Sequence, residues 1–233
     1  MQNNFVLCEA DKLNIEDQLD VFYSSIVNRL LPSFSELEKE ADNIEKESLI
    51  KSSKYFNPEI MDEACVVEDA YFDGVNHYLI QNQMKQSFLN VSTLWLYHLF
   101  EQQLNNISLK IIENFDYTKI KKSREQIENC LIEKGLVDNV HWQKIDKDLR
   151  LVANTLKHAE GRSKNDLEKI RPDLFASSSA STVKVAIPLF ENEICVSKLD
   201  FNKYHEAIVG FWGDYFNNIP VTQPHKSPNH NKR

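Results

Sequence analysis

The stretch FLNVSTLWLYHLFEQQLNNISLKI, residues 88–111, carries the strongest helical pattern in the chain. Its large apolar side chains recur every three to five residues, at Phe88, Val91, Trp95, Leu99, Leu104, Ile107 and Ile111. Spacings of three and four residues place side chains on one face of an α-helix. An apolar face this wide is typical of a helix in the middle of a core. We therefore expect a central helix over residues 79–114 and a mainly α-helical fold around it.

Helical patterns continue on both sides of this stretch. An N-terminal helix is predicted from Asn14, which can cap it, and Pro32 either opens a second helix or kinks the first. Residues 60–78 have a weaker pattern, and Asn57-Pro58 predicts a break before them. Downstream, further helices are expected over 123–135 (opened by a capping box at Ser123), 138–161, 163–171 and from Asp200 onward. The pattern as a whole predicts a helical bundle.

The period changes to two near the C-terminus. Val183, Val185 and Ile187 alternate with other residues, a turn-like segment follows at 191–193, and Ile194-Cys-Val comes next. This alternation predicts a small β-hairpin. We therefore expect a helical bundle over 1–175, the hairpin plus a final helix packed on the bundle over 176–219, and a disordered tail over 220–233.

Composition excludes several function classes. The 233 residues include only five glycines, without the clusters that phosphate-cradling loops need. The four cysteines are far apart, so no zinc or redox motif is present, and neither a metal nor a cofactor is expected. The N-terminus lacks a secretion signal, and no run approaches the roughly 20 apolar residues of a membrane span. These features predict a cytoplasmic protein with reduced, mostly buried thiols and no membrane partner.

The charge is unevenly distributed. Of the net −8, residues 1–70 carry 16 acids and 6 bases, while the remaining residues carry 19 acids and 21 bases. The acidic part, above all 35–47, is typical of a solvated helix face. The rest of the chain has a net charge of +2 and can accommodate a local site for anions.

The predicted helix through residues 142–158 has two distinct faces. At about 100° per residue, one arc holds the apolar residues Trp142, Ile145, Leu149, Val152, Ala153 and Leu156. A second arc holds Lys147, Arg150, Asn154, Lys157 and His158. A row of cations, an amide and an imidazole suits a phosphodiester, although a polar row opposite an apolar stripe also occurs on any surface helix.

The chemistry that this row could perform is metal-independent RNA cleavage. His158 would be the general acid or base, Asn154 would orient it, and Arg150 would stabilise charge on the phosphorane. Lys157, Lys147 and Arg162 would bind the substrate, and Glu101, close to His98, would support the same cleft. Arg150 and His158 are eight positions apart, about 12 Å along the axis, so a second copy in a homodimer would complete the site.

One segment, residues 149–161, reads LRLVANTLKHAEG and is followed by Arg162-Ser-Lys and by Arg171-Pro-Asp-Leu-Phe175. It resembles the last core helix of the HEPN superfamily. The similarity extends over residues 85–175 and is closest to bacterial members with an Asn-x-x-Lys-His-x-x-Gly signature. The family motif is an arginine, four to six residues, and then a histidine. Asn154 and His158 match the pattern, whereas Arg150 lies one residue too early.

The resemblance implies a dimeric helical bundle. Many HEPN proteins are metal-independent ribonucleases in toxin–antitoxin, antiviral defence and CRISPR-linked systems, and others are inactive binding modules. Two functional interpretations therefore remain open: an RNA-cleaving toxin or defence effector with a possible antitoxin partner, and a non-catalytic adaptor that binds RNA, a nucleotide or a protein. A third is structural, with Asn154 and His158 satisfying buried polar groups at a helix-packing or dimer interface.

Overall fold

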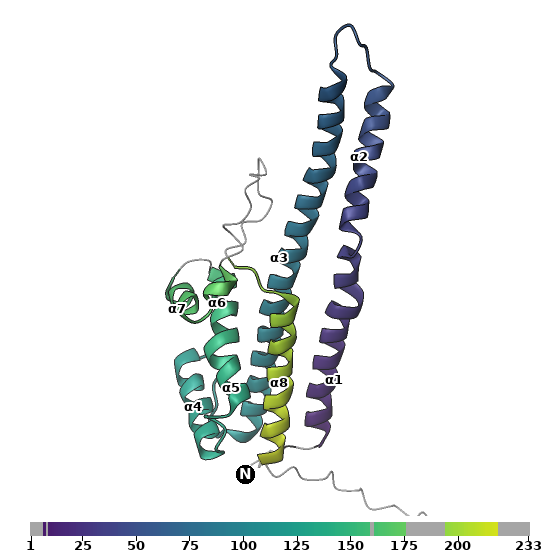
Figure 1. The fold of residues 1–233 in the computed structure, drawn as a ribbon. Helices are drawn as coiled ribbons and strands as arrows, with labels where there is room; N and C mark the ends of the chain where they lie inside the picture. The colour runs from purple at the N-terminus through teal and green to yellow at the C-terminus, as the bar shows by residue number, and fades with distance from the viewer. Residues whose placement is uncertain (1–6, 8, 159–160, 176–193, 219–233) are drawn as a thin grey trace, which may run out of the picture. The chain divides into compact units, whose positions relative to one another are not determined.

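The computed structural model describes residues 7, 9–158, 161–175 and 194–218, and these are mainly α-helical (Figure 1). They divide into two compact units. Unit 1 contains residues 1–23, 93–170 and 199–233, and unit 2 contains residues 24–92 and 171–198. The limits 1–175, 176–219 and 220–233 stay predictions, because residues 176–193 and 219–233 lie outside the described ranges.

The helices follow one another without a described strand between them. In chain order they are α1 (Glu9–Ser25), the π-helical η1 (Ile26–Leu30), the 3-10 helix η2 (Leu31–Phe34), α2 (Leu37–Ser53), α3 (Glu63–Ile111), α4 (Ile120–Glu133), α5 (Val140–Lys144), the π-helical η3 (Ile145–Leu149), α6 (Arg150–His158), α7 (Arg162–Ile170), the 3-10 helix η4 (Pro172–Leu174) and α8 (Lys198–Asn218).

The core of unit 1 is built on the aromatic face of α8. Phe201, Tyr204, Phe211, Trp212 and Tyr215 are each at most 2% exposed. The rings of Phe211 and Trp212 lie 5.4 and 5.9 Å from Phe100 of α3, and Phe211 lies 5.5 Å from Trp142 of α5. Offset and edge-on ring contacts at these distances stabilise a core beyond the burial of apolar area alone. α8 thus fixes α3 and α5 against each other.

Buried polar side chains in unit 1 are paired across helices. Gln103 of α3 is 3% exposed; it accepts a hydrogen bond from Trp212 Nε1 at 3.0 Å and donates one to Gln18 of α1 at 3.1 Å. A buried amide that bonds on both sides avoids the cost of an unsatisfied polar group. This single side chain therefore sets the registers of α1 and α8 on α3.

The central helix is longer than predicted and turned from the predicted face. α3 begins at Glu63, so the weak pattern over 60–78 belongs to the same helix as 79–114. Leu104 and Ile107 are buried as expected, and Leu96 and Phe100 join them. Val91 and Trp95 were wrongly placed in the core, since they are 40% and 52% exposed. Nearly every turn of this segment carries apolar residues on more than one side, so spacing alone could not choose between the faces.

In unit 2, α2 runs antiparallel to the first part of α3 (Figure 1). The break predicted at Asn57-Pro58 is confirmed, because the turn between these helices contains it. Gly74 allows a close approach, since a Cβ there would meet the carbonyl oxygen of Ala41 at 2.9 Å. Ser48 Oγ donates to Asp73 at 2.5 Å, and His77 Nε2 lies 3.6 Å from a carboxylate oxygen of Glu40. Polar contacts thus supplement a thin apolar seam.

Asn90 anchors the segment that precedes α8. Its side chain is 3% exposed; Nδ2 donates to the Ile194 carbonyl at 2.7 Å, and Oδ1 accepts from the Val196 backbone N–H at 3.0 Å. These two bonds give the backbone of this segment the hydrogen-bond partners that a neighbouring β-strand would otherwise provide. Ile194–Val196 is accordingly not the β-strand that we predicted, because its backbone pairs with a side chain of α3. The first strand and the turn of the predicted hairpin, at 183–193, lie outside the described residues.

Two predicted helix starts are wrong. Asn14 lies inside α1, where its side chain accepts from Gln18, and α1 begins at Glu9. Ser123 lies inside α4, which begins at Ile120, and its hydroxyl donates to the Ile120 carbonyl. Ser and Asn side chains bond to nearby backbone or side-chain groups within a helix as well as at its start, so the letters alone misplace the cap. The stop predicted at Gly135 is confirmed by its φ of 70°.

Among the described residues, no helix combines the length and apolar character that crossing a membrane requires. Cys65, Cys130 and Cys195 are free thiols, and burial raises the pKa of Cys130 and of Cys195. Cys65 is exposed, and Cys130 and Cys195 are half-buried, so the prediction of mostly buried thiols is wrong for the described cysteines.

Replacing the anchoring amide tests its role. Asn90→Ala leaves the Ile194 carbonyl and the Val196 N–H without their partner, so we expect the free energy of unfolding to fall by about 1–3 kcal/mol. Urea unfolding followed by circular dichroism measures the change. Asn76→Ala, at an exposed site of the same helix, is the matched control and should cost less than about 1 kcal/mol. Equal effects of the two substitutions would contradict the anchor.

His205 makes the stability of unit 1 pH-dependent. Burial lowers its pKa, against the opposing effects of Asp20, a hydrogen bond with the Leu19 backbone and Glu206, and its ring stacks on Tyr23 at 4.2 Å. The unfolded chain takes up a proton near pH 6.5, where the folded protein does not. The free energy of unfolding should therefore fall from pH 7 to pH 5, and fall less in His205→Gln. Urea midpoints across this range measure both slopes, and identical slopes would exclude this histidine as the cause.

A candidate anion-binding cleft beside helix α6

The polar row predicted from the sequence lies on one continuous helical stretch formed by α5, η3 and α6. Asn139 caps it: its side-chain oxygen accepts from the backbone N–H groups of His141 and Trp142 at 2.9 and 3.2 Å. The Asn139 side-chain nitrogen also donates to Asp214 of α8 at 2.7 Å. The same residue thus starts the helix and attaches it to the aromatic core of unit 1.

The middle of this stretch, Ile145–Leu149, is a π-helical turn. A π-turn inserts an extra residue and shifts the angular register of everything that follows it. One consequence is that Asp148 turns inward, where it is 7% exposed and accepts hydrogen bonds from Tyr204 at 2.9 Å and from Lys144. The side chain of Arg150 follows immediately and is 28% exposed. The predicted apolar face is confirmed for Ile145, Leu149, Val152 and Ala153, which are each at most 2% exposed.

A cleft of about 360 Å³ lies between α3, α4 and this stretch. Its apolar wall includes aromatic rings from three segments, and its polar groups comprise three cations and three carboxylates. The charged lining residues are Arg124, Arg150, Lys157, Glu101, Glu128 and Asp146; the aromatic ones are Tyr97, Phe100, Tyr117 and Trp142. A cleft of this size with a few converging polar groups is typical of a ligand site.

Two arginines converge on one carboxylate in this cleft. Arg124 of α4 donates to Asp146 Oδ1 at 2.5 Å, and Arg150 Nε donates to the same oxygen at 3.1 Å and to the Asp146 carbonyl at 3.0 Å. Both guanidinium groups are partly exposed, at 48% and 28%. Asp146 therefore positions two cations side by side at the cleft and neutralises one of their charges.

A second polar group forms at the α3 wall. Tyr97 is 8% exposed, and burial raises its pKa, followed by the charge of Glu101 and a hydrogen bond to that carboxylate. The Glu101 Oε2 atom also lies 3.2 Å from His98 Nδ1. Glu101 thus accepts a hydrogen bond from the Tyr97 hydroxyl and also contacts the His98 imidazole, so one carboxylate holds both side chains.

The structure distributes the predicted site residues between the cleft and the solvent. Arg150, Lys157 and Glu101 line the cleft together. Lys147 and His158 are exposed, Asn154 is half-buried, and none of these three lines it. Arg162 is 95% exposed and pairs with Asp166 of α7 at 3.5 Å. Arg150 and Lys157 share the cleft because they are two helical turns apart, whereas His158 lies about 100° further around α6.

Arg124, Asp146 and Tyr97 were missed as site residues by the sequence reasoning. The pairing of Arg124 with a carboxylate 22 residues away carries no sequence signal. Asp146 could have been suspected, because it lies four positions before Arg150 on one helix, a spacing at which opposite charges meet.

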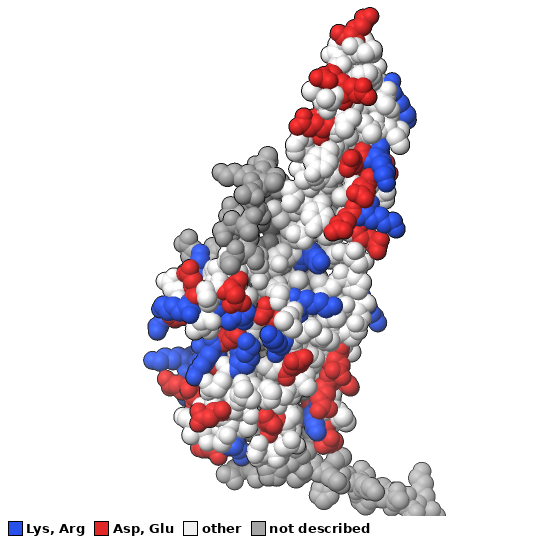
Figure 2. All heavy atoms as spheres, in the orientation of Figure 1, with Lys and Arg blue, Asp and Glu red and all other residues white. Residues whose placement is uncertain are grey.

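Basic side chains gather on one part of unit 1. Figure 2 shows Lys and Arg concentrated over the region of α6 and α7. Residues 141–170 carry seven bases and five acids, which agrees with the picture. This part of the surface therefore provides a locally positive surround for the cleft despite the net charge of the chain.

Comparisons with known proteins give no functional information, so the interpretation of the cleft depends on its own residues. Family models, curated proteins and solved structures were each searched, and none matches this chain. Within the described residues, no group of three or more His, Cys, Asp or Glu side chains could hold a metal ion.

Removing the shared carboxylate should increase the affinity of the cleft for anions. Asp146→Ala leaves Arg124 and Arg150 without their neutralising partner, so we expect binding of tripolyphosphate to tighten by about threefold or more. Isothermal titration calorimetry at low salt measures it. Asp138→Ala, which changes the charge equally at an exposed site outside the cleft, is the control. Unchanged or weaker binding in Asp146→Ala would show that the arginines do not face the ligand.

Proposed function

We propose that this chain is a HEPN-like RNA-binding module that holds a phosphodiester backbone along α6 and the adjoining cleft. The observation that carries the proposal is the convergence of Arg150, Lys157 and Arg124 on one partly exposed cleft. Guanidinium groups bind phosphate oxygens in a bidentate manner, and lysine adds a mobile point charge. The aromatic side chains in the same cleft offer surfaces on which unpaired bases stack.

The placement of His158 supports a functional rather than a structural role. Its side chain is exposed, so it satisfies no buried polar group at a helix-packing interface within the chain. It is the last residue of α6, next to Lys157. A protonated imidazole beside bound RNA is equipped to donate a proton to a leaving oxygen.

Metal-independent cleavage of RNA is therefore the second candidate function. In it, His158 acts as the general acid or base, and the half-buried Asn154, one turn earlier, orients the RNA or the imidazole. Because Arg150 is about 12 Å away along α6, the cation at the scissile phosphate comes from Lys157 or from a second copy in a homodimer. A toxin or defence role, with a protein antitoxin, belongs to this candidate.

Binding and cleavage are separable by two substitutions. Lys157→Ala removes an exposed cation that forms no ion pair within the described residues, so RNA affinity should fall about three- to tenfold and the salt dependence should weaken by about one ion. His158→Ala should leave binding nearly unchanged and lower any cleavage by about a hundredfold or more. Fluorescence anisotropy with single-stranded RNA and gel analysis of the same RNA give the two readouts.

Lys134→Ala is the matched control, because this exposed lysine lies at the end of α4 outside the cleft. Lys134→Ala should bind RNA like the wild type. If the wild-type protein neither binds nor cleaves single-stranded RNA or tRNA at low salt, both candidate functions are excluded. If it binds RNA without cleaving it, only the non-catalytic binding function remains.

A further inference from the structure

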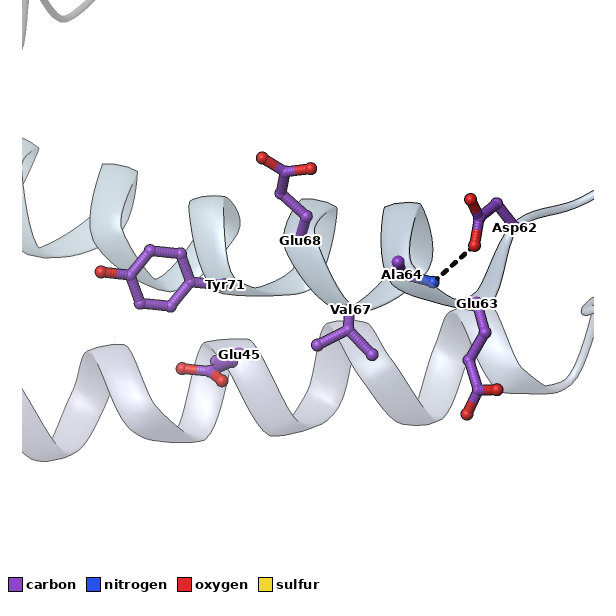
Figure 3. Close-up of a pocket in the computed structure, with 7 residues that line it drawn as sticks. All are labelled: Glu45, Asp62, Glu63, Ala64, Val67, Glu68 and Tyr71. Atoms are coloured by element: carbon purple, nitrogen blue, oxygen red, sulfur yellow. Dashed lines mark hydrogen bonds between the residues drawn. The ribbon is translucent and has the colours of Figure 1, made fainter.

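The turn end of the α2–α3 hairpin in unit 2 presents an open groove of about 750 Å³. We name it the acidic groove; it is lined by Glu45, Asp62, Glu63, Ala64, Val67, Glu68 and Tyr71. Figure 3 shows Val67 and Glu63 pointing toward α2, which carries Glu45. Four of the seven lining residues are carboxylates and none is basic, so the groove has a strongly negative rim.

The floor of the acidic groove is apolar and uncovered. Val67 and Tyr71 lie one turn apart on α3 and are 48% and 53% exposed. The carboxylates of Glu45, Glu63 and Glu68 form no ion pair within the part of the chain that the structure describes. Asp62 differs, because it caps α3 by accepting from the Ala64 N–H at 3.0 Å. Exposed apolar side chains ringed by unpaired carboxylates match a partner with an apolar side chain flanked by cations.

The chain itself presents such a surface at the start of α4. We name Lys119, Ile120, Lys121 and Lys122 the basic knob. Ile120 is 82% exposed between lysines, and Lys119 is paired with Asp116 at 3.5 Å. Lys121 and Lys122 have no ion-pair partner among the described residues, and Glu125 is the carboxylate that lines the same hollow.

The basic knob also lies at an unsatisfied helix end. α4 has no acidic residue in its first turn, and the side chain of its N-cap residue Lys119 makes no capping hydrogen bond. Cations at a helix N-terminus oppose the helix dipole, and the first N–H groups of a helix have no partner within it. Carboxylates brought to this end by a partner would therefore stabilise the helix and pair with its lysines.

We propose that the acidic groove of one molecule docks the basic knob of a second copy of this chain. Ile120 packs on Val67 and Tyr71, while Lys121 and Lys122 pair with the Glu63 and Glu68 carboxylates. Groove-to-groove association is disfavoured, because it would bring the carboxylates of two copies together. The contact uses neither Arg150, Lys157 nor His158, and Ile120 is the one residue that it shares with the lining of the candidate anion-binding cleft.

Charge reversal tests this contact. Glu63→Lys/Glu68→Lys places lysines at both pairing positions of the groove, and Lys121→Glu/Lys122→Glu places carboxylates at both pairing positions of the knob. Each double variant alone should self-associate at least about tenfold more weakly than the wild type. Mixed at equal amounts, they should associate with each other, because the lysines introduced in one groove then meet the carboxylates introduced in the other copy's knob. Sedimentation velocity on the full chain over a concentration series measures all three.

Two controls separate this contact from general charge effects. Glu38→Lys/Glu47→Lys makes the same change in net charge on exposed residues of α2 outside the groove, and should associate like the wild type. Wild-type association should weaken between about 0.1 M and about 1 M salt, where the Debye length falls from about 10 to about 3 Å. Circular dichroism checks that each variant is folded. A wild type that stays monomeric at every concentration, or mixed variants that do not associate, would overturn the proposal.

Discussion

The packing of the aromatic face of α8 on Phe100 and Trp142 is the contact on which the rest of unit 1 depends. α8 begins 87 residues after α3 ends, yet its rings fill the space between α3 and α5. Each buried aromatic side chain removes a large apolar area from water, so this cluster contributes strongly to the stability of unit 1. Gln103 and Asn139 then add directional bonds to α8 that fix the registers of the neighbouring helices.

The cleft follows from this packing. Tyr204 of α8 donates a hydrogen bond to Asp148. The π-turn that contains Asp148 directs Arg150 toward α4. There Asp146 draws Arg124 to the same position. The charged residues of the cleft are therefore positioned by a core that lies on the other side of their own helix. A chemically active surface is supported in this way by rigid packing rather than by a loop.

Helix content and the apolar stripe of 142–158 could be predicted because they depend on local spacing. Leu149 and Val152 are buried as their positions require. The grouping of the polar residues was less predictable, because a π-turn has no clear sequence signature and changes the angle at which Arg150 and His158 leave the helix. Pairings such as Arg124 with Asp146, or Asn90 with the backbone of Ile194, join residues distant in sequence, and the sequence contains no periodic signal for them. Trp95 shows the same limit, since an apolar residue at helical spacing can face solvent.

The two guanidinium groups held by Asp146 give the cleft a built-in counter-ion. A ligand must displace a carboxylate whose local concentration is very high, because it belongs to the same helix as Arg150. A small monovalent anion gains too little from that exchange. A ligand with several closely spaced negative charges can engage both arginines and Lys157 at once. Competition with Asp146 would thus set a minimum charge density that a ligand needs in order to bind, independently of its shape.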